Sequence, residues 1–144
     1  MSDALIGMSA TAPVPARSRI LASLIVPFAF GLARLRPAHL EGLLARLARR
    51  SHPASRELVE HSLDAVVTVS SRCAGRYCLQ RSLAVALVCR LHGAWPDWCA
   101  GAATNPFRAH AWVEVDGVPV REPSGLAAGF VTTMRVPAGL ARAV

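Results

Sequence analysis

Cys78 is the residue of this 144-residue chain that is best placed to act as a nucleophile. It opens the apolar run CLQRSLAVALVCRLHG, which predicts a helix that ends at Gly93, a residue type common just after helix C-termini. At the first turn of a helix, free backbone N–H groups and the helix dipole stabilise an anion, so a thiolate is favoured there. A buried structural thiol is the alternative, because free cysteine is among the most buried residue types.

The other cysteines, Cys73, Cys89 and Cys99, lack such a position, and we predict structural roles for them. The chain has neither paired C-x-x-C motifs nor the cysteine density of a disulfide scaffold, which indicates reduced thiols and no metal site. A zinc module that uses Cys89 and His92 with Cys99 and another cysteine is a weaker alternative, because Cys89 and His92 would lie on a largely buried helix.

A second candidate, His110, lies in the segment AHAWVEVDGVPVRE, which predicts a strand, a turn and a second strand. Alternation along the first strand places His110, Trp112 and Glu114 on one face. A carboxylate beside the imidazole would fix its tautomer and stabilise the imidazolium. Glu114 lies about 13 Å along the strand at 3.3 Å per residue, and we predict that it is a surface charge.

The turn after this strand decides which carboxylate faces His110. A three-residue loop that ends at Gly117 sets Glu122 opposite His110, whereas a two-residue loop of Asp116 and Gly117 sets Pro123 there. Opposed Cβ atoms are about 4.5–5.5 Å apart, so the three-residue loop would make Glu122 the partner of the imidazole. Asp116 is about 20 Å along the strand and too distant. A solvated carboxylate at a strand end is the alternative for Glu122.

The part of the chain that precedes the predicted strands is predicted to be helical. Leu40, Leu43, Leu44 and Leu47 follow the i, i+3, i+4, i+7 spacing of one amphipathic stripe. Pro27 should bend or interrupt the first helix, because proline lacks a backbone donor and clashes with the preceding turn. The predicted helices span residues 17–34, 37–50, 55–71 and 78–93.

After Gly93 the chain becomes rich in short segments of Val, Thr and aromatic residues, which predict an antiparallel sheet. Helices followed by a sheet indicate the α+β class. We predict a flexible arm at residues 1–16 and a single domain at 17–144, with a helical part at 17–72 and a catalytic helix with the sheet at 73–144.

The chain has 16 basic and nine acidic residues and a net charge of +7, which suits an acidic partner. A non-enzymatic basic module that binds nucleic acid through the arginines of residues 34–50 is therefore an alternative. The sequence contains no nucleic-acid-binding motif, and we expect no nucleic-acid partner. The longest apolar run, residues 20–33, is too short for a membrane-spanning helix, which needs about 20 residues. It also lacks the features of a secretion signal, so we expect a cytoplasmic protein without a membrane span.

The runs CLQRSLAVALVCRLHG and NPFRAHAWVEVDG, with His110 placed 32 residues after Cys78, resemble the transglutaminase-like cysteine peptidases that remove leader segments during lasso-peptide maturation. The resemblance is firm from Arg72 to Glu122 and loose in the helical N-terminal part. It implies a papain-like or transglutaminase-like fold, no cofactor, and a triad of Cys78, His110 and Glu122. Relatives commonly have Asp where this chain has Glu122.

The resemblance also implies a substrate and partners. These are a precursor leader peptide, a separate small leader-recognition protein, and the ATP-dependent macrocyclase that would receive the freed core peptide. The backbone N–H of Cys78 is a candidate oxyanion donor, and Gln80 or Trp98 could supply a second. Acyl transfer to an amine in place of water stays open, because a triad alone does not select the acceptor.

Overall fold

The structure is a computed structural model and describes residues 8–123, 125 and 127–140. The helices precede a small antiparallel sheet, which confirms the predicted α+β class. Each predicted helix is present, with ends that differ from the predicted ones by at most two residues, and a short helix, α4, precedes the last one. The helices are α1 (Ala16–Leu32), α2 (Pro37–Ala48), α3 (Arg56–Val69), α4 (Ser71–Ala74) and α5 (Cys78–Leu91).

Local signals account for the starts and ends of these helices. Pro37 occupies the first turn of α2, where its missing N–H costs no hydrogen bond. The Ser55 side chain accepts a hydrogen bond from the Leu58 N–H at 3.1 Å and caps α3. Gly93 follows α5 with φ +78°, a conformation that glycine adopts without strain. The expected interruption at Pro27 is wrong: α1 continues through it, with Ala22 and Ala29 buried on either side.

The main sheet has four strands in the order β5-β4-β3-β6, and every pair in it is antiparallel. A separate parallel pair, β1 with β2, was not predicted. A 3₁₀ helix, η2 (Ala127–Gly129), precedes the last strand. The strands are β1 (His52–Pro53), β2 (Ala94–Trp95), β3 (Asp97–Ala103), β4 (Arg108–Val115), β5 (Val118–Pro119) and β6 (Val131–Val136).

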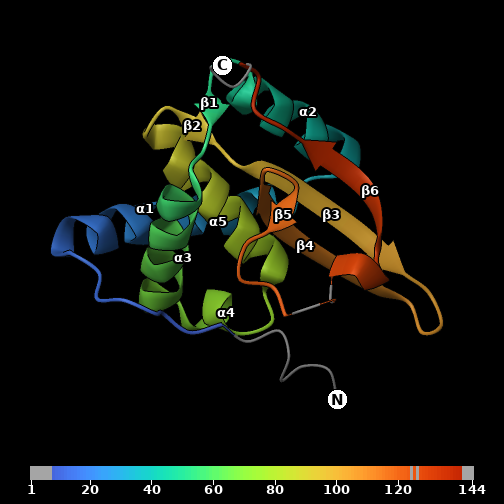
Figure 1. Cartoon of the computed structure of the whole chain (residues 1–144), viewed down its shortest axis with the longest axis horizontal. Helices are drawn as coiled ribbons and strands as arrows, with labels where there is room; N and C mark the ends of the chain where they lie inside the picture. The colour runs from blue at the N-terminus through green and yellow to red at the C-terminus, as the bar shows by residue number, and fades with distance from the viewer. Residues whose placement is uncertain (1–7, 124, 126, 141–144) are drawn as a thin grey trace.

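Helix α5 runs through the middle of the molecule, between α1 and α3 on one side and β4 on the other (Figure 1). Its residues from Arg81 to Ala86 are buried without a break, which is typical of a helix enclosed on all sides. The Trp98 Nε1–H donates to Ser82 Oγ at 3.0 Å and so ties β3 to this helix. The N-terminal half of α5, which begins at Cys78, is thereby tied to the sheet.

The division of the chain at residues 16 and 72 stays a prediction. Residues 1–7 of the expected arm lie outside the described residues. In the rest of the arm, the Met8 N–H donates to the Ala74 carbonyl at 2.7 Å, and Thr11 contacts Asp64 of α3.

No helix among residues 8–123, 125 and 127–140 has the length and apolar character needed to cross a bilayer.

Candidate active site

Cys78 is the first residue of α5, as predicted. No side chain caps this end of the helix, because Tyr77 at the N-cap position makes no such hydrogen bond. The first-turn N–H groups of α5 therefore have no side-chain acceptor from the N-cap residue and can donate to a bound substrate. Cys78 itself is half-buried and lines a cleft.

His110 lies on β4, directly opposite Gly101 of β3. Its imidazole hydrogen-bonds to the Cys78 sulfur, and its Nε2 atom hydrogen-bonds to Glu122 Oε1. The structure thus brings the three predicted site residues into one chain of contacts. Their catalytic roles stay predictions.

The surroundings of Cys78 favour its thiolate. Burial raises the pKa of this thiol, but the His110 hydrogen bond, the donated Ala111 N–H, and the charges of His110 and Arg81 together lower it below the ordinary 9.0. Burial lowers the pKa of His110, but its hydrogen bonds to Cys78 and Glu122, and the negative charges of both groups, raise it from 6.5 to about 9. The two shifts favour the same state, a thiolate beside an imidazolium.

The hairpin brings Glu122 to His110 by a route different from the predicted one. Glu114 pairs with Pro119 and Val115 with Val118, so the turn is the two-residue loop and the predicted three-residue loop is wrong. Positive φ values at Asp116 and Gly117, +54° and +78°, identify the turn as type I′. A regular continuation of this ladder would set Pro123 opposite His110.

The ladder does not continue regularly. The Val120 N–H still donates to the Val113 carbonyl at 3.0 Å, but Arg121 then takes φ +56°. This left-handed residue breaks the alternation of the strand, as a bulge does, and Glu122 turns to His110. Such a conformation costs a non-glycine residue roughly 1–2 kcal/mol, so the surroundings must hold it in place.

Two aromatic rings lie against the imidazole of His110. Trp112 stacks on His110 with ring centroids 5.6 Å apart and an interplanar angle of 16°, and Phe130 lies 5.4 Å away. A Cβ atom on Gly101 would lie 2.7 Å from the Val131 carbonyl oxygen and 3.2 Å from both rings' side chains. Only glycine therefore allows β6 and these rings to approach β3 so closely.

Glu114 is buried, so its predicted place on the surface is wrong. The Trp112 Nε1–H donates to its Oε2 at 2.7 Å, and Arg135 donates to its Oε1 at 2.9 Å. Alternation correctly placed Glu114 on the face of His110, but the side chains of Phe130 and Arg135 also lie on that face. Glu114 thus supports the tryptophan that stacks on the imidazole.

Arg81 is a further site residue that the sequence analysis did not single out. This side chain is 3% exposed, and its Nη1 donates to the carbonyls of Cys73 and Gly75 at 2.8 and 2.9 Å. The contacts fix the segment that leads into Cys78, and the positive charge lies one helical turn after the thiol. The spacing from Cys78 to Arg81 was the only available signal.

The cleft at Cys78 and His110 has a volume of about 460 Å³ and is mainly apolar. The second oxyanion donor, for which Gln80 and Trp98 are the candidates, stays a prediction. The Trp98 N–H is taken by Ser82, and Gln80 lines a different cavity beside Phe30. The other lining residues include Leu35, Pro37, Leu40, Leu79, Ala100, Ala102, Phe107, Ala109 and Met134.

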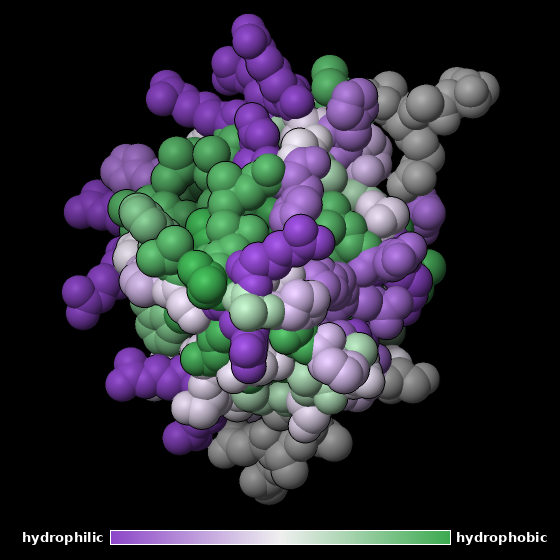
Figure 2. Space-filling view, turned by 90° about the vertical axis from the view of Figure 1, so that its left-hand side faces the viewer, coloured by the Kyte–Doolittle hydropathy of each residue, from purple (hydrophilic) through white to green (hydrophobic). Residues whose placement is uncertain are grey.

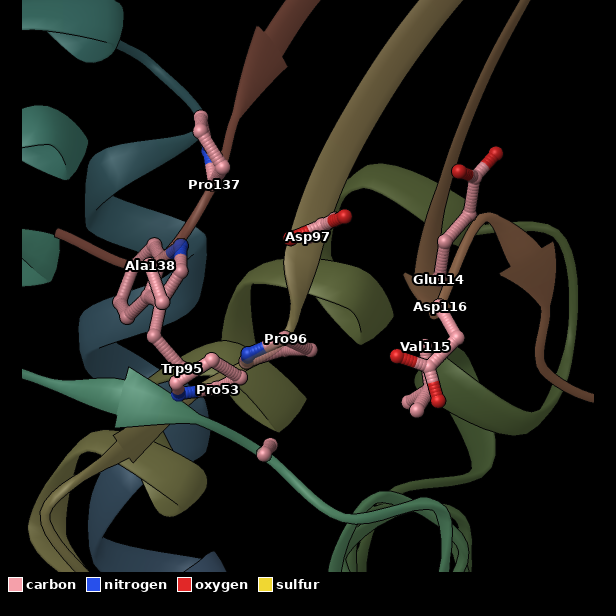
Figure 3. Close-up of a pocket in the computed structure, with 10 residues that line it drawn as sticks. Pro53, Trp95, Pro96, Asp97, Glu114, Val115, Asp116, Pro137 and Ala138 are labelled. Carbon is pink, nitrogen blue, oxygen red and sulfur yellow. The ribbon is translucent and has the colours of Figure 1, made fainter. Parts of the chain in front are cut away.

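A second cavity, of about 180 Å³, has a different character. Its lining includes the acidic residues Asp97, Glu114 and Asp116 together with Trp95 (Figure 3). It contains neither Cys78 nor His110. The thiol and the imidazole therefore open into an apolar cleft that is separate from this second cavity.

All four cysteines are free thiols. Cys89 Sγ lies 3.6 Å from Ser62 Oγ, and His92 Nδ1 lies 2.9 Å from the Val88 carbonyl oxygen. Within the part of the chain that the structure describes, no three His, Cys, Asp or Glu side chains are grouped as metal ligands would be. The zinc alternative gains no support from these contacts.

Comparison with known proteins identifies one family. The profile of the Transglutaminase-like superfamily matches residues 22–135, which make up more than half of the chain and contain Cys78, His110 and Glu122. Neither a curated protein nor a solved structure shows significant similarity to the chain.

Proposed function

Because the chain belongs to the transglutaminase-like superfamily, we propose that it is a cysteine peptidase that removes the leader segment from a ribosomally made lasso-peptide precursor. The fold itself is shared by cysteine peptidases and acyltransferases, so the activity must be argued from the site. The observation that carries the proposal is the contact chain from Cys78 through His110 to Glu122, at the wall of an apolar cleft.

The proposed reaction begins with attack of the Cys78 thiolate on the carbonyl carbon of the scissile peptide bond. The negative charge moves to the carbonyl oxygen, where the backbone N–H of Cys78 can donate to it. As the C–N bond breaks, the His110 imidazolium gives its proton to the departing amine, and a thioester remains on Cys78. Neutral His110 then takes a proton from water, which hydrolyses the thioester and restores the thiolate. Glu122 orients the ring throughout.

The cleft supports a peptide substrate that carries no charge near the scissile bond. Its lining is mainly apolar, and a buried charge without a partner would lose its hydration there. The volume of about 460 Å³ lies in the range of small-ligand sites and accommodates a few side chains. We therefore propose that the residues flanking the cut are small or apolar.

The helical side supports the proposed docking of a leader-recognition protein. On α1, Ile20, Leu24 and Phe28 recur at intervals of four residues and are 62%, 64% and 69% exposed. Figure 2, which views the helical side of Figure 1, shows apolar surface bordered by hydrophilic side chains. Apolar surface rimmed by polar groups is typical of an interface.

The macrocyclase would receive the freed core peptide, and we propose a cytoplasmic site for these steps.

A cleavage assay tests the proposal. The purified protein is mixed with a precursor peptide and its candidate leader-recognition protein, and the products are analysed by mass spectrometry. The proposal expects two fragments whose masses add up to the precursor plus one water, and no fragments with Cys78→Ala. Products that carry an added amine in place of water would support the acyltransferase alternative. An intact precursor together with salt-dependent binding to an acidic partner would support the basic-module alternative.

A further inference from the structure

Arg121, the residue immediately before Glu122, has a backbone conformation that residues other than glycine seldom adopt. Its φ of +56° lies in the left-handed region. Without this turn the carboxylate would continue along the ladder of β5 and away from His110. What holds Arg121 therefore decides where Glu122 lies.

The side chain of Arg121 is anchored on two distant segments. Its Nη1 donates to Asp64 Oδ1 of α3 at 2.6 Å, and its Nη2 donates to Thr11 Oγ1 at 2.7 Å. Glu60, one turn earlier on α3, offers its carbonyl at 3.3 Å and its carboxylate at 3.5 Å. The guanidinium is thus held from several directions, with 13% of its side-chain surface exposed.

Asp64 is itself fixed. It is 4% exposed, and its Oδ1 also accepts the Thr11 backbone N–H at 2.9 Å. A buried carboxylate needs such partners, because an unpaired buried charge is strongly unfavourable. The segment before α1, helix α3 and the segment after β5 therefore meet at a single ion pair, one residue from the acid of the proposed triad.

We infer that Asp64 and Arg121 are positioning residues: their ion pair holds residue 121 in the left-handed turn that points Glu122 at His110, and Thr11 completes the anchor. The catalytic consequence of this inference rests on the proposed function. The role of the ion pair in placing Glu122 beside the imidazole is independent of the proposed function. A purely structural ion pair would contribute to folding and leave the imidazole unaffected.

Two variants remove the anchor in different ways. Asp64→Asn keeps the shape of the carboxylate and removes its charge. Arg121→Gly removes the guanidinium but keeps a residue that adopts positive φ readily, so it separates the anchor from backbone strain. Arg56→Gln is the matched control, because it removes an exposed ion pair with Glu60 on the same helix, at 3.6 Å, and leaves the pair of Arg121 and Asp64 in place.

The first readout is the NMR titration of the His110 ring in the folded protein without substrate. The ionisable groups that contact this ring are Cys78 from α5 and Glu122, and Arg108 lies over the adjacent Phe130 ring. Loss of the anchor should lower the titration midpoint of His110 by about one pH unit, towards the midpoint measured in Glu122→Gln. Thr11→Val should give a smaller shift in the same direction, and Arg56→Gln none.

The second readout is cleavage kinetics. Both anchor variants should lower kcat about 10-fold to 100-fold with KM nearly unchanged, since the cleft itself is intact. Unchanged titration of His110 in folded Asp64→Asn and Arg121→Gly would overturn the inference. Should Asp64→Asn fail to fold, Arg121→Gly and Thr11→Val decide the question. If the wild-type protein cleaves no precursor, the proposed function fails, while the titration still tests the positioning role.

Discussion

Cys78 and Cys89 lie at opposite ends of α5, in surroundings that differ in each property that governs thiol reactivity. Cys78 is half-buried and meets an imidazole and a backbone N–H from β4. Cys89 is fully buried beside the Ser62 hydroxyl, and burial raises the pKa of its thiol to about 12. One helix therefore carries an activated thiol and an inert one. Groups on the sheet, together with the helix terminus, cause the difference.

The first prediction concerns the two thiols themselves. Cys78→Ala should lower peptide cleavage about 10⁴-fold or more, because the nucleophile is lost. Cys89→Ala should leave kcat within a factor of about two and cost on the order of 1 kcal/mol of unfolding free energy, through a small cavity. Cleavage rates and thermal unfolding of both variants test this. Full activity in folded Cys78→Ala would remove this residue from the mechanism.

The second prediction compares two histidines near the ends of α5. His110→Ala should abolish cleavage about as completely as Cys78→Ala, because the thiol then loses both its hydrogen bond and its positive neighbour. His92→Ala, at the other end of the helix, should leave kcat nearly unchanged, since its contact is with the Val88 carbonyl. Equal loss of activity in both variants would mean that the imidazole beside Cys78 has no special role.

The third prediction compares carboxylates of the hairpin. Glu122→Gln should lower kcat between about 10² and 10⁴-fold, because the imidazolium loses its charged partner. Asp116→Asn should change kcat less than about two-fold, since asparagine tolerates the positive φ of the turn and lies far from His110. Steady-state kinetics of the two folded variants show which of the two carboxylates supports catalysis. A larger effect at Asp116 would contradict the geometry of the site.

The fourth prediction concerns pH. The reactive pair exists above the lowered pKa of Cys78 and below the pKa of His110, which is about 9. Cleavage should therefore follow a bell-shaped pH profile, with an acid limb from protonation of the thiolate and an alkaline limb near pH 9 from deprotonation of the imidazolium. Glu122→Gln should move the alkaline limb to lower pH. An alkaline limb that stays in place would show that Glu122 does not support the imidazolium.

Much of the fold could be predicted from local patterns. The stripe of Leu40 and Leu44 faces the core, and the glycine after α5 has the expected positive φ. The passage of α1 through Pro27 was not predictable in this way. Packing of this helix against α3 and α5 offsets one missing hydrogen bond, and tertiary contacts of that kind leave no mark in local sequence.

The candidate site was only partly predictable. Residue type and helix position indicated Cys78, and strand alternation with the resemblance indicated His110. The contact between Glu122 and His110 was predicted for the wrong reason, because the left-handed turn at Arg121 has no signature in the sequence. Only the fold brings Asp64, which lies far away in the chain, to that arginine.

Selective alkylation of the four cysteines tests the central claim most directly. The protein is treated briefly with iodoacetamide at a series of pH values, and the modified residues are mapped by mass spectrometry. The account predicts that near neutral pH Cys78 reacts at least about 10-fold faster than Cys73, Cys89 and Cys99, and that His110→Ala removes this advantage. A Cys78 that reacts no faster than the buried thiols, or that reacts only above its ordinary pKa of 9.0, would contradict it.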